Sequence, residues 1–117
     1  EYLRKNLETT ELQRQAFRKA VHSGVRIGFG TDSGVIPHGT NARQFAYMVR
    51  YGMTPMQAIQ SATVEAAALM GRERELGQVA PGFYADLIGV KGDPLTEIRV
   101  LESPPLVMQG GRLIRDL

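Results

Sequence analysis

The sequence predicts an α/β protein, and two observations lead to this fold class. A helical pattern is followed directly by a short apolar run at residues 25–29, which is typical of a buried strand. Further along, short apolar runs separated by Gly and Pro predict a small β part. Because the composition changes at about residue 73, we divide the chain into a helical part, residues 1–72, and a β part, residues 73–117.

The first predicted helix runs from a capping box to a glycine. Thr10 and Gln13 have the spacing of a capping box, and Gly24 stands where a helix C-cap is expected. Apolar residues between them repeat on one helical face. They are Leu12, Ala16, Phe17, Ala20 and Val21. The predicted strand follows at once.

A loop rich in Gly, Pro and Asn covers residues 30–41 and leads into further helices. Asn41 is expected to cap a short helix that runs to Tyr51, rather than to contact a substrate. Residues 54–57, Thr-Pro-Met-Gln, form a second capping box with Pro at the first helical position. Thr63 is a further capping residue, so this helix is predicted to divide into two. Residues expected to face inward are Phe45, Met48, Val49, Ile59, Ala62, Ala66 and Leu69.

The β part contains four short apolar runs that are candidate strands. The first two are residues 78–80 and 85–90. The last two, residues 106–109 and 112–114, flank Gly110-Gly111. Two positions with positive φ suit a Gly-Gly pair, so these runs predict a tight hairpin.

One carboxylate, Asp32, directly follows the predicted strand, in the turn Gly30-Thr31-Asp32-Ser33-Gly34. α/β enzymes place catalytic groups and metal ligands just past the C-terminal end of a strand. Asp-Ser-Gly is equally ordinary turn chemistry, because an Asx side chain bonds the backbone two residues on. Thr31 and Ser33 either orient Asp32 or satisfy the backbone of the turn.

The order of six segments along the chain resembles the C-terminal end of the amidohydrolase superfamily. The segments are GTDSG, PHGTN, YGMTPMQAIQSAT, GQVAPGFYADLIGV, GDPLTEI and VMQGGRLI. The branch that the chain resembles is that of the metal-dependent hydrolases similar to imidazolonepropionase and Xaa-Pro dipeptidases. The resemblance covers about Leu7 to Ile114, and its specificity lies in the order and spacing of the segments.

The resemblance implies that residues 1–72 hold the last strand and helices of a TIM barrel, (β/α)8, and residues 73–117 the C-terminal half of a small β-sandwich. The chain would then be a fragment. A single parallel strand at residues 25–29 needs neighbours on both sides, and a small one-sided sheet needs a second layer. The implied partners are the missing N-terminal part of the same protein or further copies of this chain as a homo-oligomer.

The resemblance also implies that Asp32 is both a metal ligand and the catalytic proton acceptor. The implied cofactor is zinc, one or two ions, with most ligands outside this chain, which has two histidines and no His-x-His pair. His38 lies in a loop that the family places over the active-site mouth. It is either a substrate contact or a histidine that orders its own loop. The implied reaction is hydrolysis of a C–N bond in a small amide, dipeptide or cyclic amide, and the isolated chain is expected to be inactive.

The other candidate residues are expected to have structural roles. His22 stands near a helix C-terminus, where a cation favours the helix dipole. Asp86 is expected to be a turn or edge residue, and residues 72–75 a solvated charge run. The expected core methionines are Met48, Met53, Met56 and Met70.

Composition argues against several classes of function. The net charge of +2 is scattered along the chain, which gives no indication of a nucleic-acid partner. No apolar run approaches the ~20 residues that span a bilayer. Without cysteine there are no disulfides, thiolate metal sites or cysteine nucleophiles, which fits a cytoplasmic protein.

Two other functions are alternatives to a hydrolase, namely dinucleotide binding and a non-catalytic role. Gly28-Phe29-Gly30 after a strand is partly similar to a dinucleotide fingerprint, but Ser33 stands where the third glycine should be. Pro37 and Gly39 also break the helix that the fingerprint requires. The remaining alternative is a non-catalytic binding or oligomerisation module derived from an amidohydrolase.

Overall fold

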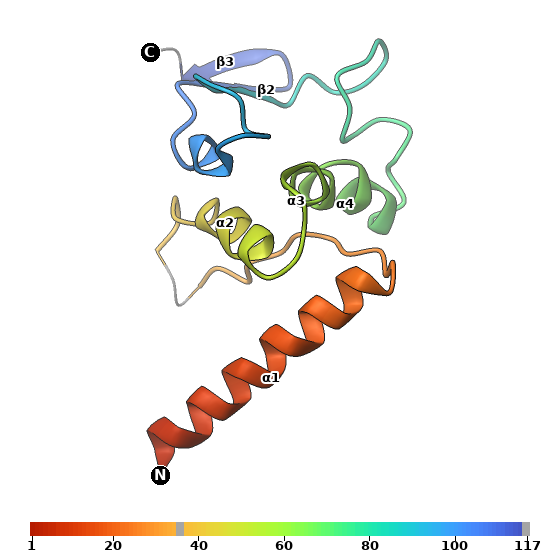
Figure 1. Cartoon of the computed structure of the whole chain (residues 1–117). Coiled ribbons are helices and arrows are strands. Elements are labelled where there is room, and N and C mark those ends of the chain that lie inside the picture. Colours follow the sequence, from red (N-terminus) through yellow and green to blue (C-terminus); the bar gives the residue numbers. More distant parts are fainter. Residues whose placement is uncertain (35–36, 116–117) are drawn as a thin grey trace.

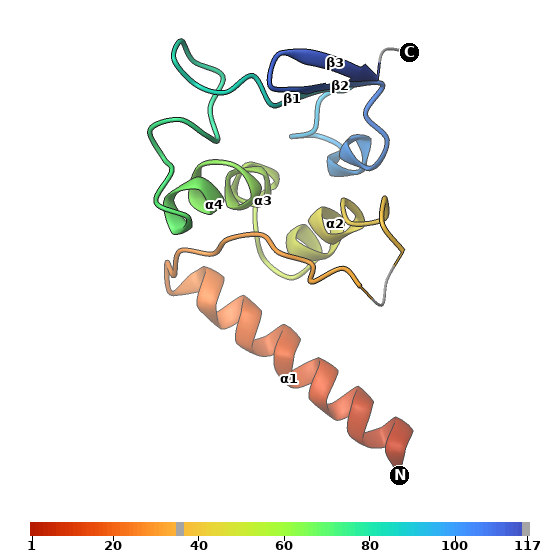
Figure 2. The same ribbon diagram turned by 180° about the vertical axis from the view of Figure 1, so that it is seen from behind.

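The computed structural model describes residues 1–34 and 37–115, over which the chain is an α/β structure whose α-helices precede its sheet (Figure 1). The helices are α1 (Tyr2–His22), α2 (Arg43–Arg50), α3 (Pro55–Ala62), α4 (Val64–Leu69) and the 3-10 helix η1 (Ile98–Glu102). The strands are β1 (Leu87–Gly89), β2 (Leu106–Gln109) and β3 (Arg112–Arg115). Figures 1 and 2 show α2, α3 and α4 between α1 on one side and η1 with the sheet on the other.

α1 begins at Tyr2, so the capping box predicted at Thr10 and Gln13 is wrong. Thr10 lies inside the helix, and its hydroxyl donates to the carbonyl of Asn6 at 2.7 Å. A threonine hydroxyl that bonds one turn back is used within a helix and does not start one. Gly24 ends the helix as predicted, with a φ of 71°.

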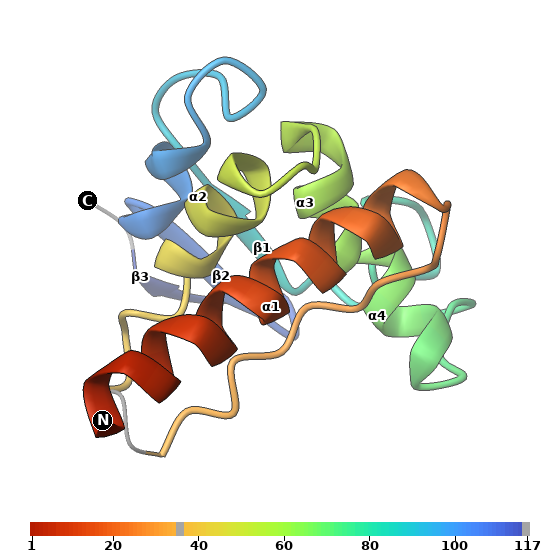
Figure 3. The same cartoon turned by 60° about the horizontal axis from the view of Figure 1, so that its bottom comes forward.

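Only the C-terminal half of α1 packs against the rest of the chain. Phe17 and Val21 contact the core from this half. The N-terminal half extends away from the other elements, as Figures 1 and 2 show, and in Figure 3 the same helix lies in front of them. Its large apolar side chains are 66–80% exposed. They are Tyr2, Leu3, Leu7 and Leu12.

The core lies where α1, α2 and α3 meet. Met48, Met53 and Ala58 are buried there. The rings of Phe29 and Phe45 stack beside them with centroids 4.7 Å apart. Partly buried side chains complete the cluster, namely Phe17, Val21, Ile27, Phe29, Phe45 and Val49. The inward face predicted for α2 is therefore confirmed, whereas Met56 and Met70 are exposed and the prediction that they belong to the core is wrong.

Residues 25–29 have no regular secondary structure, and the predicted strand is wrong for this chain. Val25 is 56% exposed rather than buried, while Ile27 and Phe29 are partly buried. The N–H of Phe29 donates to the carbonyl of Ser61 at 2.8 Å. A parallel strand needs hydrogen-bonding neighbours. Within the part of the chain that the structure describes, the one sheet is formed by residues after 86.

α3 begins at the predicted capping box. Thr54 Oγ1 accepts from the N–H of Gln57 at 3.1 Å, and Gln57 Oε1 accepts from the N–H of Thr54 at 2.8 Å. The division at Thr63 is also confirmed. The side chain of Thr63 does not cap α4, however, because its hydroxyl donates to the carbonyl of Ile59 at 2.9 Å.

The buried face of α3 and α4 differs from the predicted one. The buried residues are Ala58, Ser61 and Ala67, and Leu69 is 70% exposed. Ser61 is tolerated there because its hydroxyl donates to the carbonyl of Ala58 at 2.6 Å. Its carbonyl accepts the bond from Phe29. The buried face of α3 therefore contains the polar side chain of Ser61, whereas the pattern of apolar residues had predicted that the adjacent face of the helix is buried.

The sheet is antiparallel in the order β1-β2-β3, with Leu87 opposite Met108 and Gln109 opposite Arg112. The predicted hairpin is confirmed, and its two glycines have φ of 54° and 79°. β1 is shorter than the run predicted at residues 85–90. No strand forms at residues 78–80, where Val79 is 87% exposed.

Asp86 lies directly before the edge strand β1, as predicted, and its carboxylate accepts a bond from the N–H of Gly110 at 2.7 Å. This bond attaches β1 to the hairpin turn. η1 packs against α2 and so joins the helices to the β part. The division of the chain at residue 73 stays a prediction.

We expect Gly111→Ala to destabilise the chain by about 1 kcal/mol, since a left-handed conformation costs a non-glycine residue roughly that much. A Cβ at Gly111 meets no atom within 4 Å, so only the backbone conformation is tested. Gly30→Ala is the matched control, because Gly30 has the same open surroundings without a positive φ. Equal free energies of urea unfolding for the two variants would contradict this account of the hairpin.

Candidate active site

The candidate site is built around Asp32, three residues beyond the last core residue of the segment, Phe29. Among the described residues other than glycine, Asp32 is the one with a positive φ, 48°. Asp adopts this left-handed region more readily than most residues. Its side chain is exposed. The turn therefore presents the carboxylate of Asp32 to solvent from a left-handed backbone conformation.

Three polar side chains are bonded together beside Asp32. The amide nitrogen of Asn41 donates to Thr31 Oγ1 and to Ser33 Oγ, each at 2.8 Å. The two hydroxyl oxygens lie 3.0 Å apart, so one of them donates to the other. The amide oxygen of Asn41 accepts from the N–H of Gly39 at 3.2 Å. We call Thr31, Ser33 and Asn41 the Asn41 cluster.

The prediction that Asn41 caps α2 is wrong. Ala42 occupies the N-cap position and α2 begins at Arg43. The amide of Asn41 is used by the Asn41 cluster instead of by the helix. Sequence spacing carries no signal for this role, because the partner hydroxyls lie eight and ten residues away.

His38 is exposed in the same loop. The hydrogen bonds that order its turn come from neighbouring side chains. Thr40 Oγ1 donates to the carbonyl of Pro37 at 2.7 Å, and Asn41 holds Gly39. The role of His38 as a substrate contact stays a prediction.

A cavity of about 170 Å³ lies beside the Asn41 cluster. It is lined by Thr31, Ser33, Thr40, Asn41, Arg43, Gln44 and Tyr47. Asp32 does not line it. The carboxylate of Asp32 therefore lies apart from the Asn41 cluster and from the cavity beside it.

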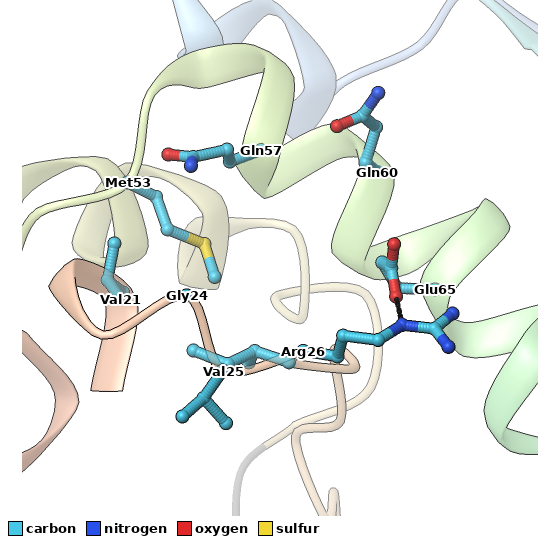
Figure 4. Close-up of a pocket in the computed structure, with 9 residues that line it drawn as sticks. Val21, Gly24, Val25, Arg26, Met53, Gln57, Gln60 and Glu65 are labelled. Atoms are coloured by element: carbon cyan, nitrogen blue, oxygen red, sulfur yellow. Dashed lines mark hydrogen bonds and ion pairs between the residues drawn. The ribbon is translucent and has the colours of Figure 1, made fainter.

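A different cavity, of about 220 Å³, lies between the end of α1 and α3 (Figure 4). At one edge the Nε of Arg26 donates to the carboxylate of Glu65 at 2.7 Å. The other lining residues are Val21, Gly24, Val25, Ile27, Met53, Gln57 and Gln60. Neither Asp32 nor His38 is among them, so we do not place the candidate site there.

The described residues supply only part of a metal-binding donor set. Within residues 1–34 and 37–115, no three His, Cys, Asp or Glu side chains lie close enough together to hold a metal ion. A catalytic zinc site usually has three protein ligands, and a carboxylate such as that of Asp32 is a suitable one. His22 lies at the end of α1, where its Nδ1 bonds to the carbonyl of Arg18 at 2.7 Å, and it belongs to no such group of three among the described residues. The remaining ligands would have to come from elsewhere.

The charge run at residues 72–75 is separate from the site. Residues 72–74 are exposed, as predicted. The guanidinium of Arg72 bonds to Glu75, and this bond raises the pKa of Arg72 above its ordinary value. Arg72 also lies over the ring of Tyr84 at 5.7 Å. These contacts order the loop before β1.

The chain is similar to known hydrolases over most of its length. The model of the amidohydrolase family matches residues 3–114. Ochratoxinase from Aspergillus niger is 37% identical over 106 residues, which are 86% of this chain and 22% of that protein. Adenine deaminase from Moorella thermoacetica is 37% identical over 70 residues, 59% of this chain and 12% of that protein.

Solved structures agree with these relatives. A Xaa-Pro dipeptidase with methionine bound in the active site superimposes with a TM-score of 0.84 at 51% identity, covering 87% of this chain and 25% of that one. A putative prolidase from Bifidobacterium longum gives a TM-score of 0.82 at 33% identity, covering 86% and 26%. The chain thus spans about a quarter of the length of these enzymes.

We expect the 117-residue chain to retain far less than one equivalent of zinc after dialysis against micromolar zinc, measured by atomic emission. The reason is the incomplete donor set around Asp32. Asp32→Asn should leave the small amount of bound zinc unchanged. One tightly held equivalent that is lost in Asp32→Asn would show that the chain builds a metal site by itself.

Proposed function

The chain belongs to the amidohydrolase family, and we propose that it is the C-terminal part of a metal-dependent enzyme that hydrolyses C–N bonds. The observation that carries this proposal is the family match over residues 3–114, which includes the Asp32 turn. The proposed substrate is a small amide, a dipeptide or a cyclic amide. Similar proteins, among them a Xaa-Pro dipeptidase, an ochratoxinase and an adenine deaminase, support hydrolysis of a C–N bond.

In this proposal residues 25–29 are the last strand of a (β/α)8 barrel, and the strands after residue 86 belong to the C-terminal half of a β-sandwich. Two features of the chain support it. Residues 25–29 lack strand partners, and Phe29 bonds to a helix carbonyl instead. The sheet has three strands and leaves Ile88 and Ile114 exposed. Both features are expected when neighbouring strands and a facing layer are supplied by the rest of a protein.

Asp32 would act at the centre of the proposed reaction. A zinc ion bound there would lower the pKa of its water towards ~7 and so supply a nucleophile at neutral pH. Asp32 offers an exposed carboxylate that contributes one ligand and accepts a proton at an oxygen. Every other ligand of the proposed metal is expected from residues outside the described segments.

His38 is proposed as a substrate contact near the same point. Asn41 bonds to Gly39, directly after His38, and also to both neighbours of Asp32. One amide therefore holds the loop of His38 beside the Asp32 turn. An exposed imidazole in that place can donate or accept a hydrogen bond with an amide substrate.

The proposed partners are the remaining part of the same protein or further copies of this chain. The support lies in apolar side chains that the described residues leave uncovered, on the N-terminal half of α1 and on the sheet. No helix in the described part of the chain has the length and apolar character needed to cross a membrane. We propose neither nucleic acid nor a membrane as a partner.

We expect Asp32→Asn in the full-length enzyme to lower kcat by ~10²–10⁴-fold, because the amide keeps the shape of the side chain but cannot accept the proton. Glu73→Gln is the matched control, since it removes one carboxylate from an exposed position in the charge run. The measurement is steady-state hydrolysis of a panel of Xaa-Pro dipeptides and small amides. Wild-type turnover by Asp32→Asn would refute the proposed role of this residue.

We expect the isolated chain to associate with itself at micromolar concentrations, as measured by sedimentation velocity. Replacing Leu3 and Leu7 with Glu should weaken the association, because both are exposed apolar residues of α1. Val79→Glu is the control, at an equally exposed apolar residue in a loop. A stable, folded monomer at all concentrations would favour the alternative, a self-sufficient binding module derived from an amidohydrolase.

A further inference from the structure

We propose that Asn41 is a positioning residue, which holds Asp32 in its left-handed conformation and so fixes the direction of the carboxylate. The proposal rests on the proposed function, in which Asp32 is the catalytic carboxylate. It adds a residue whose side chain does not itself face the reacting atoms. Asn41 would act through Thr31 and Ser33, the two neighbours of Asp32.

Asn41 forms hydrogen bonds with the residue before Asp32 and with the residue after it. Both N–H groups of the amide are used, one on Thr31 Oγ1 and one on Ser33 Oγ, each at 2.8 Å. The two hydroxyls also bond to each other at 3.0 Å. Because the residues before and after Asp32 are joined to one amide, the backbone between them has little freedom to leave its φ of 48°. Backbone conformations of this kind persist where the surroundings over-determine them.

The carboxylate of Asp32 takes no part in this network. The Asn41 cluster is partly buried, whereas Asp32 is exposed and does not line the cavity beside the cluster. The backbone conformation is therefore held by neutral groups, and none of the hydrogen bonds of the Asn41 cluster uses the carboxylate of Asp32. A carboxylate that made these bonds itself would be turned towards the protein.

Asn41 is in turn fixed to the core. Its backbone carbonyl accepts from the N–H of Gln44, in the first turn of α2, at 3.0 Å. One residue further along α2, Phe45 stacks on Phe29. A continuous series of contacts thus runs from the core through α2 and Asn41 to Asp32. The turn is held at both ends, by Phe29 before it and by Asn41 after it.

The test compares four forms of the full-length enzyme: wild type, Asn41→Ala, Asp32→Asn and the double variant. We expect Asn41→Ala to lower kcat about 10–100-fold, the usual effect of removing a partner that orients a functional group. KM should rise as well, because the bond of Asn41 to Gly39 in the loop of His38 is also lost. In the Asp32→Asn background, Asn41→Ala should cause no further loss of kcat, because its effect on kcat acts through Asp32. Asn6→Ala, at an exposed position of α1, is the matched control and should leave kcat unchanged.

A second readout does not depend on activity. In a crystal structure of full-length Asn41→Ala, Asp32 should leave the positive-φ region or occupy more than one conformation. If Asn41→Ala does not fold, the pair Thr31→Val and Ser33→Ala removes the bonds of Asn41 to the neighbours of Asp32 with little change in shape, and leaves its bond to Gly39. The same loss of kcat and the same displacement of Asp32 are then expected from that pair, with KM little changed.

The outcomes separate this inference from the proposed function. Wild-type turnover by Asp32→Asn overturns both. A large loss of kcat in Asp32→Asn together with wild-type kcat in Asn41→Ala overturns only the inference. The inference is also overturned if the double variant loses kcat by the product of the two single losses. An unchanged φ at Asp32 in the variant structure likewise overturns the positioning role. The expected pattern of a loss in kcat, no further loss in the double variant and a displaced Asp32 supports it.

Discussion

The stacking of Phe29 on Phe45 beside Met48 is the contact on which the rest of the arrangement depends. It joins a segment without regular secondary structure to α2, with ring centroids 4.7 Å apart. α1 and α3 pack against the same cluster, so this is where four parts of the chain meet. Aromatic side chains bury large apolar areas. Burial of this kind explains how residues 25–29 keep their place with few backbone hydrogen bonds.

The position of the Asp32 turn follows from that contact. Phe29 anchors the chain just before the turn, and Asn41 anchors it from the loop that leads into α2. Both anchors reach the same core, because Phe45 belongs to α2. A carboxylate in a left-handed turn is thereby held between two fixed points without belonging to a helix or strand. Such an arrangement fits the role proposed for Asp32, in which its carboxylate needs a fixed direction.

The proposed place of the chain in an amidohydrolase accounts for the apolar side chains that its own packing leaves exposed. A domain normally buries the apolar stripe of each helix and one face of each sheet. Here the apolar residues at the start of α1 are exposed, and residues 25–29 form no strand. The proposed barrel and sandwich explain both observations with the same missing strands. They also explain why Asp32 is accompanied by so few possible metal ligands in the described residues.

Two features whose partners lie within a few residues of each other were predicted correctly from the sequence, the capping box at residues 54–57 and the hairpin at Gly110-Gly111. The capping box at Thr10 and Gln13 was not, because α1 continues through these residues. The sequence by itself also determined the family and singled out Asp32 and His38 as candidates. The strand at residues 25–29 was predicted wrongly, because a strand exists only with neighbours that local patterns cannot supply. Only the tertiary structure decided that Asn41 bonds to the neighbours of Asp32 instead of capping α2. The physical reason is that these hydrogen bonds join the two ends of one loop, and the approach of those ends is set by the packing of Phe29 on Phe45 in the core.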